Sequence, residues 1–444
     1  MEHTLPSIPL WASIPFVLML AMIAVGPLMF NHWWEHNKNK LIVSLVLAIP
    51  MSIYLIVMGL THNLIHQVVF DYLPFIILLG ALFTITGGIH LQGDIQAKPT
   101  TNVIFLGLGA ILASIMGTTG AAMLLIRPVI RTNSERKYRV HTILFFIAIV
   151  ANCGGLLTPL GDPPLFLLYL RGASFTWFFH MLPEWAFVNG ILLIIYFIVD
   201  SYYHKKEPKT NIVMDKAINE PIKIKGKINF LFLIGVVLSV AFLNEHYLGF
   251  IKEYTIGSAE HPYHYLGFIR EISILTMAIL SLVFTKKAYR NANKFTWDPI
   301  KEVAYLFLGI FVTMVPALLY LSQNAATIGI HTAPQFYYAA GTLSSFLDNA
   351  PTAVSFYNLA LGLHDAHPGA TIVAGIPEIL LTAISLGAVF FGAMTYIGNG
   401  PNFMVKAIAE ENEIKMPSFF AYIFKFTIIV LLPVYVLTQL IFLH

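Results

Sequence analysis

Long apolar runs alternate with short polar loops along the whole chain. Six runs precede a polar, lysine-rich stretch and six follow it, at about 9–30, 41–60, 71–89, 103–126, 141–170 and 177–199, then 228–243, 265–284, 303–321, 335–360, 371–405 and 417–443. A helix needs roughly twenty predominantly apolar residues to cross a bilayer, and most of these runs reach that length. The pattern therefore predicts an all-α polytopic membrane protein with two sets of elements.

The composition supports this class. Of the 444 residues, 57% are hydrophobic and 11% are charged, and the mean hydropathy is +0.74. Soluble proteins carry roughly 25% charged residues, so we expect an integral membrane protein. The net charge of +3 does not favour a nucleic-acid partner, and a single cysteine, Cys153, excludes an intramolecular disulfide. The first run has no basic segment before it, which indicates a membrane helix and not a cleavable signal.

The run at 141–170 is interrupted midway by the sequence N-C-G-G-L-L-T-P-L-G-D-P-P-L-F, from Asn152 to Phe166. Proline lacks an N–H donor and clashes with the preceding turn, so its three prolines must unwind the helix. Unwound backbone survives at membrane depth only where protein or a water-filled cavity satisfies it, and secondary transporters build midplane sites in this way. The interruption, with Asp162 inside it, is therefore a candidate ion or substrate site.

Lysine and arginine are distributed unevenly among the loops. The loop Arg127–Arg139 holds five and the stretch 204–227 holds seven, whereas the loops 61–70 and 361–370 hold none. Short loops rich in these residues face the cytoplasm. The loops rich in lysine and arginine all fall on the cytoplasmic side, and the poor ones on the other side, only if the fourth run of each set is a re-entrant hairpin that does not cross the membrane. This assignment gives ten crossings, two hairpins and both termini outside.

The same assignment places the two sets in opposite orientations, as in the inverted repeats of many secondary carriers. We predict a first repeat at 1–203, a cytoplasmic linker at 204–227 and a second repeat at 228–444. Each repeat contains three helices, a re-entrant hairpin, a broken helix and a closing helix. The hairpins are expected at about 103–126 and 335–360, and the broken helices at about 141–170 and 371–405. A short sequence similarity, which we call the echo, supports the repeat. G-D-P-P-L-F at Gly161–Phe166 matches G-N-G-P-N-F at Gly398–Phe403.

Two acidic residues, Asp162 and Asp348, lie in the polar breaks of the two halves. A carboxylate near the membrane centre costs several kcal/mol unless it is paired or protonated. Burial favours its neutral form and a bound cation favours its charged form. One acid can then hold either H⁺ or Na⁺, which is the physical basis of exchange. The alternative for either acid is a structural role, as a cap that accepts backbone N–H bonds at a helix start.

Neutral oxygens, amides and exposed backbone groups near these breaks complete the candidate site. Small hard cations take such oxygen ligands, whereas an anionic substrate could use the positive N-terminal ends of half-helices. The predicted ion- or proton-binding residues are Asp162, Asp348, Asn349, Thr352, Asn152, Thr158 and Asn399, with sodium at Asp162, Asn349 and Asn399. The predicted substrate or hairpin-tip residues are Thr118, Thr119, Gly120, Pro351, Gly161, Gly398 and Asn402.

No soluble-enzyme signature competes with this interpretation. The chain has no phosphate-binding loop, no H-E-x-x-H and no nucleophile elbow with suitable partners. Two membrane aspartates could form the dyad of an intramembrane protease, but the Y-D and G-x-G-D contexts of the presenilin type are missing. We therefore expect no catalytic residues and no cofactor, with Na⁺ and H⁺ as transported ions.

Four segments carry a resemblance to a known family. They are G-T-T-G-A-A-M-L-L-I-R-P at Gly117–Pro128, G-G-L-L-T-P-L-G-D-P-P-L at Gly154–Leu165, D-N-A-P-T at Asp348–Thr352 and G-N-G-P-N-F-M-V-K-A at Gly398–Ala407. With them, nearly the whole chain resembles the ion transporter superfamily. That group includes sodium/proton antiporters of the NhaD type, arsenite permeases, and citrate and dicarboxylate carriers. The chain is most similar to the bacterial branch of antiporters and related citrate transporters.

The resemblance implies two hairpins and two broken helices that line a site between a transport part and a scaffold part. It also implies a bacterial inner membrane, lipid contact and a homodimer. The dicarboxylate carriers have Ser-Asn-Thr motifs at both hairpin tips, whereas this chain has G-T-T-G and D-N-A-P-T. The difference favours exchange of Na⁺ or Li⁺ for H⁺ by alternating access. The alternative is a sodium- or proton-coupled carrier of citrate or another small carboxylate, and a channel is disfavoured because opposed hairpins indicate alternating access.

Overall fold

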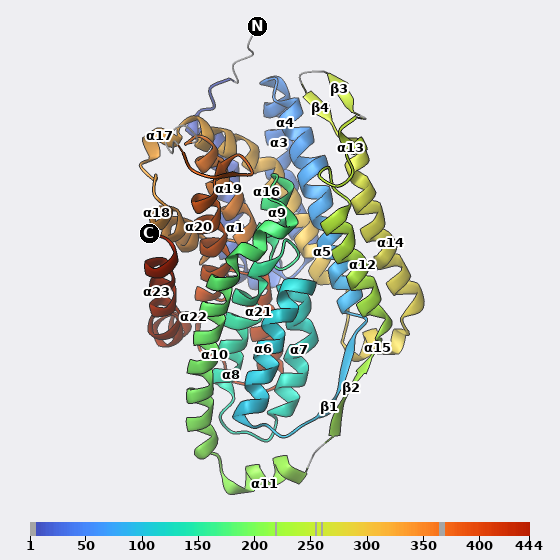
Figure 1. The fold of residues 1–444 in the computed structure, drawn as a ribbon, viewed down its shortest axis with the longest axis vertical. Coiled ribbons are helices and arrows are strands. Elements are labelled where there is room, and N and C mark those ends of the chain that lie inside the picture. Colours follow the sequence, from blue (N-terminus) through green and yellow to red (C-terminus); the bar gives the residue numbers. More distant parts are fainter. Residues whose placement is uncertain (1–5, 218–219, 254, 259–260, 364–368) are drawn as a thin grey trace.

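The structure, a computed structural model, describes residues 6–217, 220–253, 255–258, 261–363 and 369–444. The expected N-terminal end at 1–5 and positions 218–219 of the predicted linker lie outside the described residues. Figure 1 shows an elongated bundle of helices. Within the described part of the chain, nine helices are long and apolar enough to cross a membrane. The prediction of an all-α polytopic membrane protein is confirmed.

The first half follows the predicted order. Its helices and strands are α1 (Ile14–Met29), α2 (Asn31–Trp34), α3 (Asn37–Val57), α4 (Thr61–Ile65), α5 (Leu73–Thr86), β1 (His90–Asp94), α6 (Pro99–Met116), α7 (Thr118–Thr132), α8 (Val140–Ile149), α9 (Pro163–Leu170), α10 (Leu182–Lys205), α11 (Lys209–Ala217) and β2 (Glu220–Lys225). A π-helical stretch, His66–Tyr72, joins α4 to α5, so the two form one continuous crossing.

The second half repeats that order with two short strand pairs inserted. It contains α12 (Ile228–Phe242), α13 (Phe250–Glu253), β3 (Ile256–Ser258), β4 (His261–Tyr263), α14 (Ile269–Phe284), α15 (Lys287–Ala292), α16 (Asp298–Gln323), α17 (Ala325–Ile328), α18 (Ala333–Ser344), α19 (Asn349–Leu361), β5 (Ile372–Val373), β6 (Ile376–Pro377), α20 (Glu378–Phe391), α21 (Gly400–Glu411), α22 (Phe419–Tyr422) and α23 (Leu432–Phe442).

The predicted hairpins and broken helices correspond to helix pairs with sharp local interruptions. Helices α6 and α7 meet at Gly117, whose φ of +82° lies in the left-handed region that favours glycine. Helices α8 and α9 are separated by a 3₁₀ turn at Cys153–Leu157, and proline occupies the first position of α9. Proline is favoured there because a first-turn N–H has no partner within the helix.

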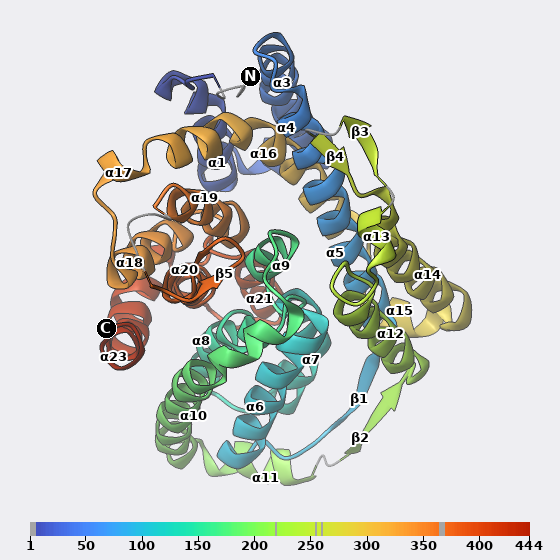
Figure 2. The same cartoon turned by 45° about the horizontal axis from the view of Figure 1, so that its top comes forward.

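The helices form two packed bodies, which Figure 2 shows as an outer arc around an inner group. In the outer arc, α12 packs on α14, α14 on α5, α5 on α16, and α16 on α3 and α1. In the inner body, α6 packs on α7 and α10, α21 on α7 and α8, α18 on α20, and α19 on α9. Both hairpins and both broken helices therefore belong to the inner body.

The two hairpins approach the middle of the molecule from opposite ends (Figure 1). Helices α6 and α7 lie toward the end that carries α11, whereas α18 and α19 lie toward the end that carries α17. The broken helices are likewise reversed, since α8 and α21 lie near one end and α9 and α20 near the other. The inverted repeat itself stays a prediction.

The predicted polar linker contains regular structure that the sequence analysis did not anticipate. Strand β2 pairs antiparallel with β1, in the register His90–Lys225, Leu91–Ile224 and Gln92–Lys223. Helix α11 is fixed at the same end, because Asp215 accepts the backbone N–H of Ala97 at 3.0 Å. The many lysines of this stretch led us to interpret it as a polar linker. The isoleucines that alternate with them in β2 are the local signal for a strand.

Close backbone contacts recur at positions 237 residues apart in the two broken helices. A Cβ atom on Gly161 would lie 1.9 Å from the carbonyl oxygen of Gly155, and one on Gly398 would lie 2.6 Å from that of Gly392. Real Cβ atoms do not approach a backbone oxygen this closely. Each interruption therefore folds back on itself in the same way and depends on glycine at both contacts.

We expect Gly161→Ala to destabilise the protein by about 3 kcal/mol, the upper end of overpacking effects, because the opposing atom is backbone and cannot rotate away. Thermal unfolding of the purified protein in detergent measures this. The matched control is Gly190→Ala in α10, where an added Cβ meets nothing within 4 Å. Equal stability of the two variants would contradict the proposed backbone contact.

Candidate functional site at the crossing of the half-helices

Asp162 lies at the centre of the inner body and is 1% exposed. Its two carboxylate oxygens accept three hydrogen bonds, from Thr118 Oγ1 at 2.8 Å, Asn349 Nδ2 at 2.8 Å and Asn399 Nδ2 at 3.2 Å. All three donors are neutral side chains, and the last two come from the other half of the chain. The structure thus brings together three predicted ion ligands and one predicted hairpin-tip residue.

Four helix starts meet at this carboxylate. Thr118 is the first residue of α7 and Asn349 the first of α19, while Asp162 and Asn399 directly precede α9 and α21. Helix N-termini present unpaired N–H groups and the positive end of the helix dipole. The site is therefore electrostatically suited to negative charge, although none of the groups that bond to Asp162 is a cation.

Asn152 and Asn402 connect the two interruptions behind Asp162. Asn399 Nδ2 also donates to Asn152 Oδ1 at 3.1 Å, and Asn152 Nδ2 donates to Asn402 Oδ1 at 2.7 Å. Asn402 Nδ2 in turn donates to the backbone oxygens of Gly392 and Thr395, at 2.7 and 2.9 Å. This chain of amides satisfies backbone that the broken helices leave unpaired, and it fixes the orientation of Asn399.

Thr158 links the first interruption to the first hairpin. Its Oγ1 donates to the backbone oxygen of Ser114 and accepts the N–H of Leu160 at 3.1 Å. Thr395, 237 residues later, does the same in the second half: it donates to the backbone oxygen of Ser345 and accepts the N–H of Ile397 at 3.2 Å. In this structure Thr158 therefore holds the first interruption against the first hairpin through hydrogen bonds to backbone groups.

The sequence analysis missed Thr395 and the hairpin serines. The serine hydroxyls join each hairpin to the broken helix beside it. Ser114 donates to the oxygen of Gly154 at 2.6 Å, and Ser344 donates to that of Ala388 at 2.6 Å. A signal was present, since the echo at Gly161 and Gly398 extends back to Thr158 and Thr395 at the same spacing of 237.

Asp348 stands apart from the Asp162 cluster. It precedes α19, and its Oδ1 accepts the N–H of Ala350 at 3.0 Å, which is the capping arrangement. Thr352 Oγ1 donates to the backbone oxygen of Asp348 at 2.9 Å, and Pro351 occupies the buried first turn of the helix between them. No hydrogen bond joins Asp348 to Asp162 in the described part of the chain.

A small cavity of about 70 Å³ separates the tip of the first hairpin from the outer arc. It is lined by Met116, Gly117, Thr118, Thr119, Gly120, Leu160, Gly161 and Pro163 of the inner body, and by Leu79, Leu82, Phe83, Pro299, Ile300 and Val303 of the arc. This volume holds a few waters or a small cation. Pockets for drug-sized organic ligands are larger, at roughly 300–1,000 Å³.

We expect Thr158→Val and Thr395→Val each to cost about 1–3 kcal/mol, because each leaves a buried N–H and a buried carbonyl without their hydroxyl partner. Thermal unfolding in detergent measures the loss, and Thr→Ser at either position should restore most of it. The control is Thr276→Val in α14, an exposed side chain that bonds only within its own helix. A Thr158→Val protein as stable as the control would contradict the structural role.

Comparison with known proteins supports the family resemblance. No curated protein matches the chain. A family model described as "Putative citrate transport" matches residues 5–443, which is nearly the whole chain. This match is consistent with the ion transporter superfamily and its citrate-transporting members. The chain belongs to the family that this description covers, and it is a multi-pass membrane protein of transporter type.

Proposed function

We propose that this transporter exchanges Na⁺ or Li⁺ for H⁺ across the bacterial inner membrane, with Asp162 as the acid that the two ions share. The observation that carries the proposal is the burial of one carboxylate among four half-helix starts with only neutral hydrogen-bond partners. A carboxylate in such a place is held by the helix N-termini, but it remains costly when no cation compensates its charge. Binding of either one H⁺ or one Na⁺ relieves that cost.

The surroundings of Asp162 favour a cation over an anion as cargo. An anionic substrate would need the positive helix ends, and the carboxylate of Asp162, which lies among them, would repel it when charged. The adjoining cavity of about 70 Å³ suits a small ion with a few waters. The hydroxyl oxygen of Thr118 lies beside the carboxylate, and half-turns of the amides of Asn349 and Asn399 would add two further oxygens once their present hydrogen bonds are released.

The two-body arrangement suits alternating access. The cavity lies where the inner body meets α5 and α16 of the arc, so a displacement of one body against the other would open it to one side or the other. Matching contacts 237 residues apart in the interruptions, and hairpins that approach from opposite ends, support our proposal that the halves are inverted repeats. Inverted repeats supply the two mirror-related states that an exchanger needs.

A second candidate is a carrier of citrate or another carboxylate coupled to Na⁺ or H⁺. The family description favours it. In this case the side chains of Thr118, Thr119 and Asn349 and the helix N-termini would hold the substrate carboxylates in a more open state. Asp162 would then bind the coupling cation.

We expect Asp162→Asn to abolish exchange, with a loss of at least about 100-fold, because the neutral amide can take up neither ion. Proteoliposomes with a trapped pH dye, challenged with Na⁺, Li⁺, K⁺ or citrate, measure this. The matched variant is Asp348→Asn, since asparagine caps a helix about as well as aspartate. We expect it to retain exchange.

Other outcomes of this experiment are equally informative. If both substitutions abolish exchange, Asp348 shares the ion, as its position in the sequence suggested. If the pH gradient responds only when citrate or another carboxylate is present, the exchanger proposal is wrong and the carboxylate carrier replaces it.

We further expect exchange to be electroneutral, one Na⁺ for one H⁺. The position equivalent to Asp162 in the second half is Asn399, and Asp348 at the start of α19 bonds to the N–H of Ala350 and not to the cluster, so we expect Asp162 alone to exchange ions. A K⁺ gradient with valinomycin imposes a membrane potential on the proteoliposomes, and the initial rate should not change. If the membrane potential accelerates exchange, then more than one charge moves per cycle. A single acid shared by the two ions would be wrong, and Asp348 would be the next acid to test.

A further inference from the structure

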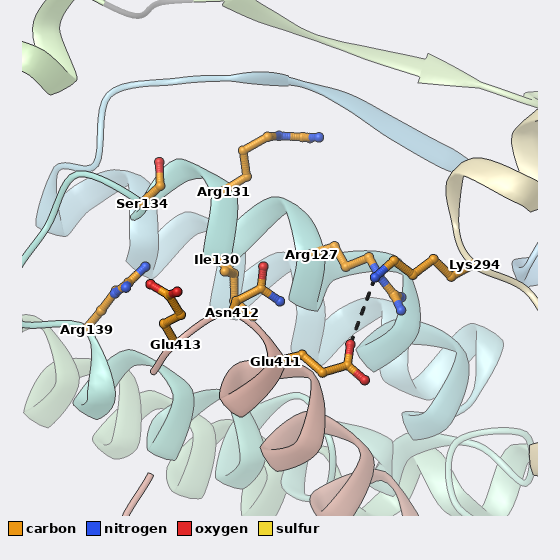
Figure 3. A pocket seen from close by; sticks show the side chains of 9 residues that line it. All are labelled: Arg127, Ile130, Arg131, Ser134, Arg139, Lys294, Glu411, Asn412 and Glu413. Atoms are coloured by element: carbon orange, nitrogen blue, oxygen red, sulfur yellow. Dashed lines mark ion pairs between the residues drawn. The ribbon is translucent and has the colours of Figure 1, made fainter. Parts of the chain in front are cut away.

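A large polar pocket of about 640 Å³ lies at one end of the inner body, away from Asp162. Figure 3 shows its side chains, which come from three regions of the chain, with Arg139 beside Glu413 and Arg127 beside Lys294 and Glu411. Its lining comprises Arg127, Ile130, Arg131, Ser134 and Arg139 around α7 and the start of α8, Glu411, Asn412 and Glu413 at the end of α21, and Lys294 between α15 and α16. The positive-inside distribution places this end in the cytoplasm.

The cations of this pocket outnumber its acids by four to two. Arg127 and Arg139 make no side-chain hydrogen bond or ion pair in the described part of the chain. Arg131 donates from Nη2 to the oxygen of Leu91 at 3.0 Å, but its Nε is buried and has no partner. The pocket thus holds several guanidinium donors that the protein itself does not use.

Neither acid forms an ion pair with these arginines within the described residues. The one ion pair drawn in Figure 3, Lys294–Glu411, spans 4.0 Å between side chains that are 72% and 60% exposed, so solvent screens it strongly. Glu413 adopts φ of +60°, in the left-handed region where glycine is the usual residue at a helix end. The protein keeps an acidic side chain there at a conformational cost.

Membrane topology alone does not account for this arrangement. Lysines and arginines that only fix orientation are expected on solvated surface segments, as Lys209 is at the exposed start of α11. Here three arginines from one stretch of chain line the same pocket, and the buried Nε of Arg131 has no hydrogen-bond partner. Guanidinium groups bind carboxylate and phosphate oxygens through paired, charge-assisted hydrogen bonds, which is the chemistry this pocket offers.

We propose that this pocket binds an oxyanion that carries two or more negative charges on carboxylate or phosphate oxygens. Arg127, Arg131 and Arg139 hold the anion from the inner body, and Lys294 reaches it from the outer arc. The bound anion therefore joins the two bodies and stabilises their present arrangement. This anion site is separate from the site at Asp162.

Titration calorimetry on the full-length protein in neutral detergent tests the proposal, with inorganic phosphate and citrate as probes and chloride at equal ionic strength as the reference. We expect saturable binding of both probes, and a loss of about tenfold in affinity for Arg127→Gln and for Arg139→Gln, the effect of one charged hydrogen bond. Lys209→Gln, an exposed cation outside the pocket, should bind as the wild type does. Asp162→Asn should also bind normally, which separates this test from that of the exchanger.

Glu413→Gln gives an effect of opposite sign that misfolding cannot mimic. Removal of one negative charge should tighten the binding of phosphate severalfold. Absence of saturable binding, or binding that none of the three pocket substitutions changes, would overturn the proposal.

Two further measurements distinguish a lipid headgroup from a soluble anion as the natural ligand of the pocket. Phosphate binding is measured again in nanodiscs of phosphatidylcholine alone and of phosphatidylcholine with phosphatidylglycerol. If the anionic lipid suppresses phosphate binding in the wild type, the pocket takes a headgroup; if binding is equal in both, it takes a soluble anion. Both results support an oxyanion site, whereas loss of phosphate binding in both nanodiscs counts against it.

Discussion

The arrangement of the inner body depends on the solvation of one carboxylate. Asp162 is removed from water, and its charge is stabilised only if hydrogen-bond donors replace the lost solvent. Those donors are Thr118 from the first hairpin, Asn349 from the second and Asn399 from the second interruption. No continuous membrane helix can bring four N-termini to one point, so both helices must break and both hairpins must turn at mid-depth. The glycine and proline content of these segments follows from that requirement.

The hydrogen bonds around this centre divide into two kinds. Thr158, Thr395 and the hairpin serines donate to backbone oxygens and hold the interruptions against the hairpins. Thr118, Asn349 and Asn399 instead donate to a group that can change its charge. A half-turn of either asparagine amide would present its oxygen to an ion, but it would also release present hydrogen bonds, such as that of Asn399 to the oxygen of Ala151.

Much of this organisation was readable from the sequence. Apolar run lengths and the lysine and arginine count predicted the elements and the hairpins, and the echo at Gly161 and Gly398 indicated which positions correspond. The sequence also predicted Asp162, Asn349 and Asn399 as ion ligands, and the structure brings these three side chains into hydrogen-bond contact. It could not show that Asp348 bonds to the N–H of Ala350, because a cap and an ion ligand use the same residue type at a helix start. The pairing of β1 with β2 was also missed, since it joins segments far apart in the chain.

The β1–β2 pair has a mechanical consequence. The chain passes from the outer arc to the inner body through β1, between α5 and α6, and returns through β2, between α11 and α12. These two connections are hydrogen-bonded to each other, so they form one ribbon that cannot lengthen on one side only. In the movement that we propose, the inner body stays joined to the arc by this ribbon and by the chain between α16 and α18. The ribbon therefore restrains the inner body as one paired unit and not as two independent loops.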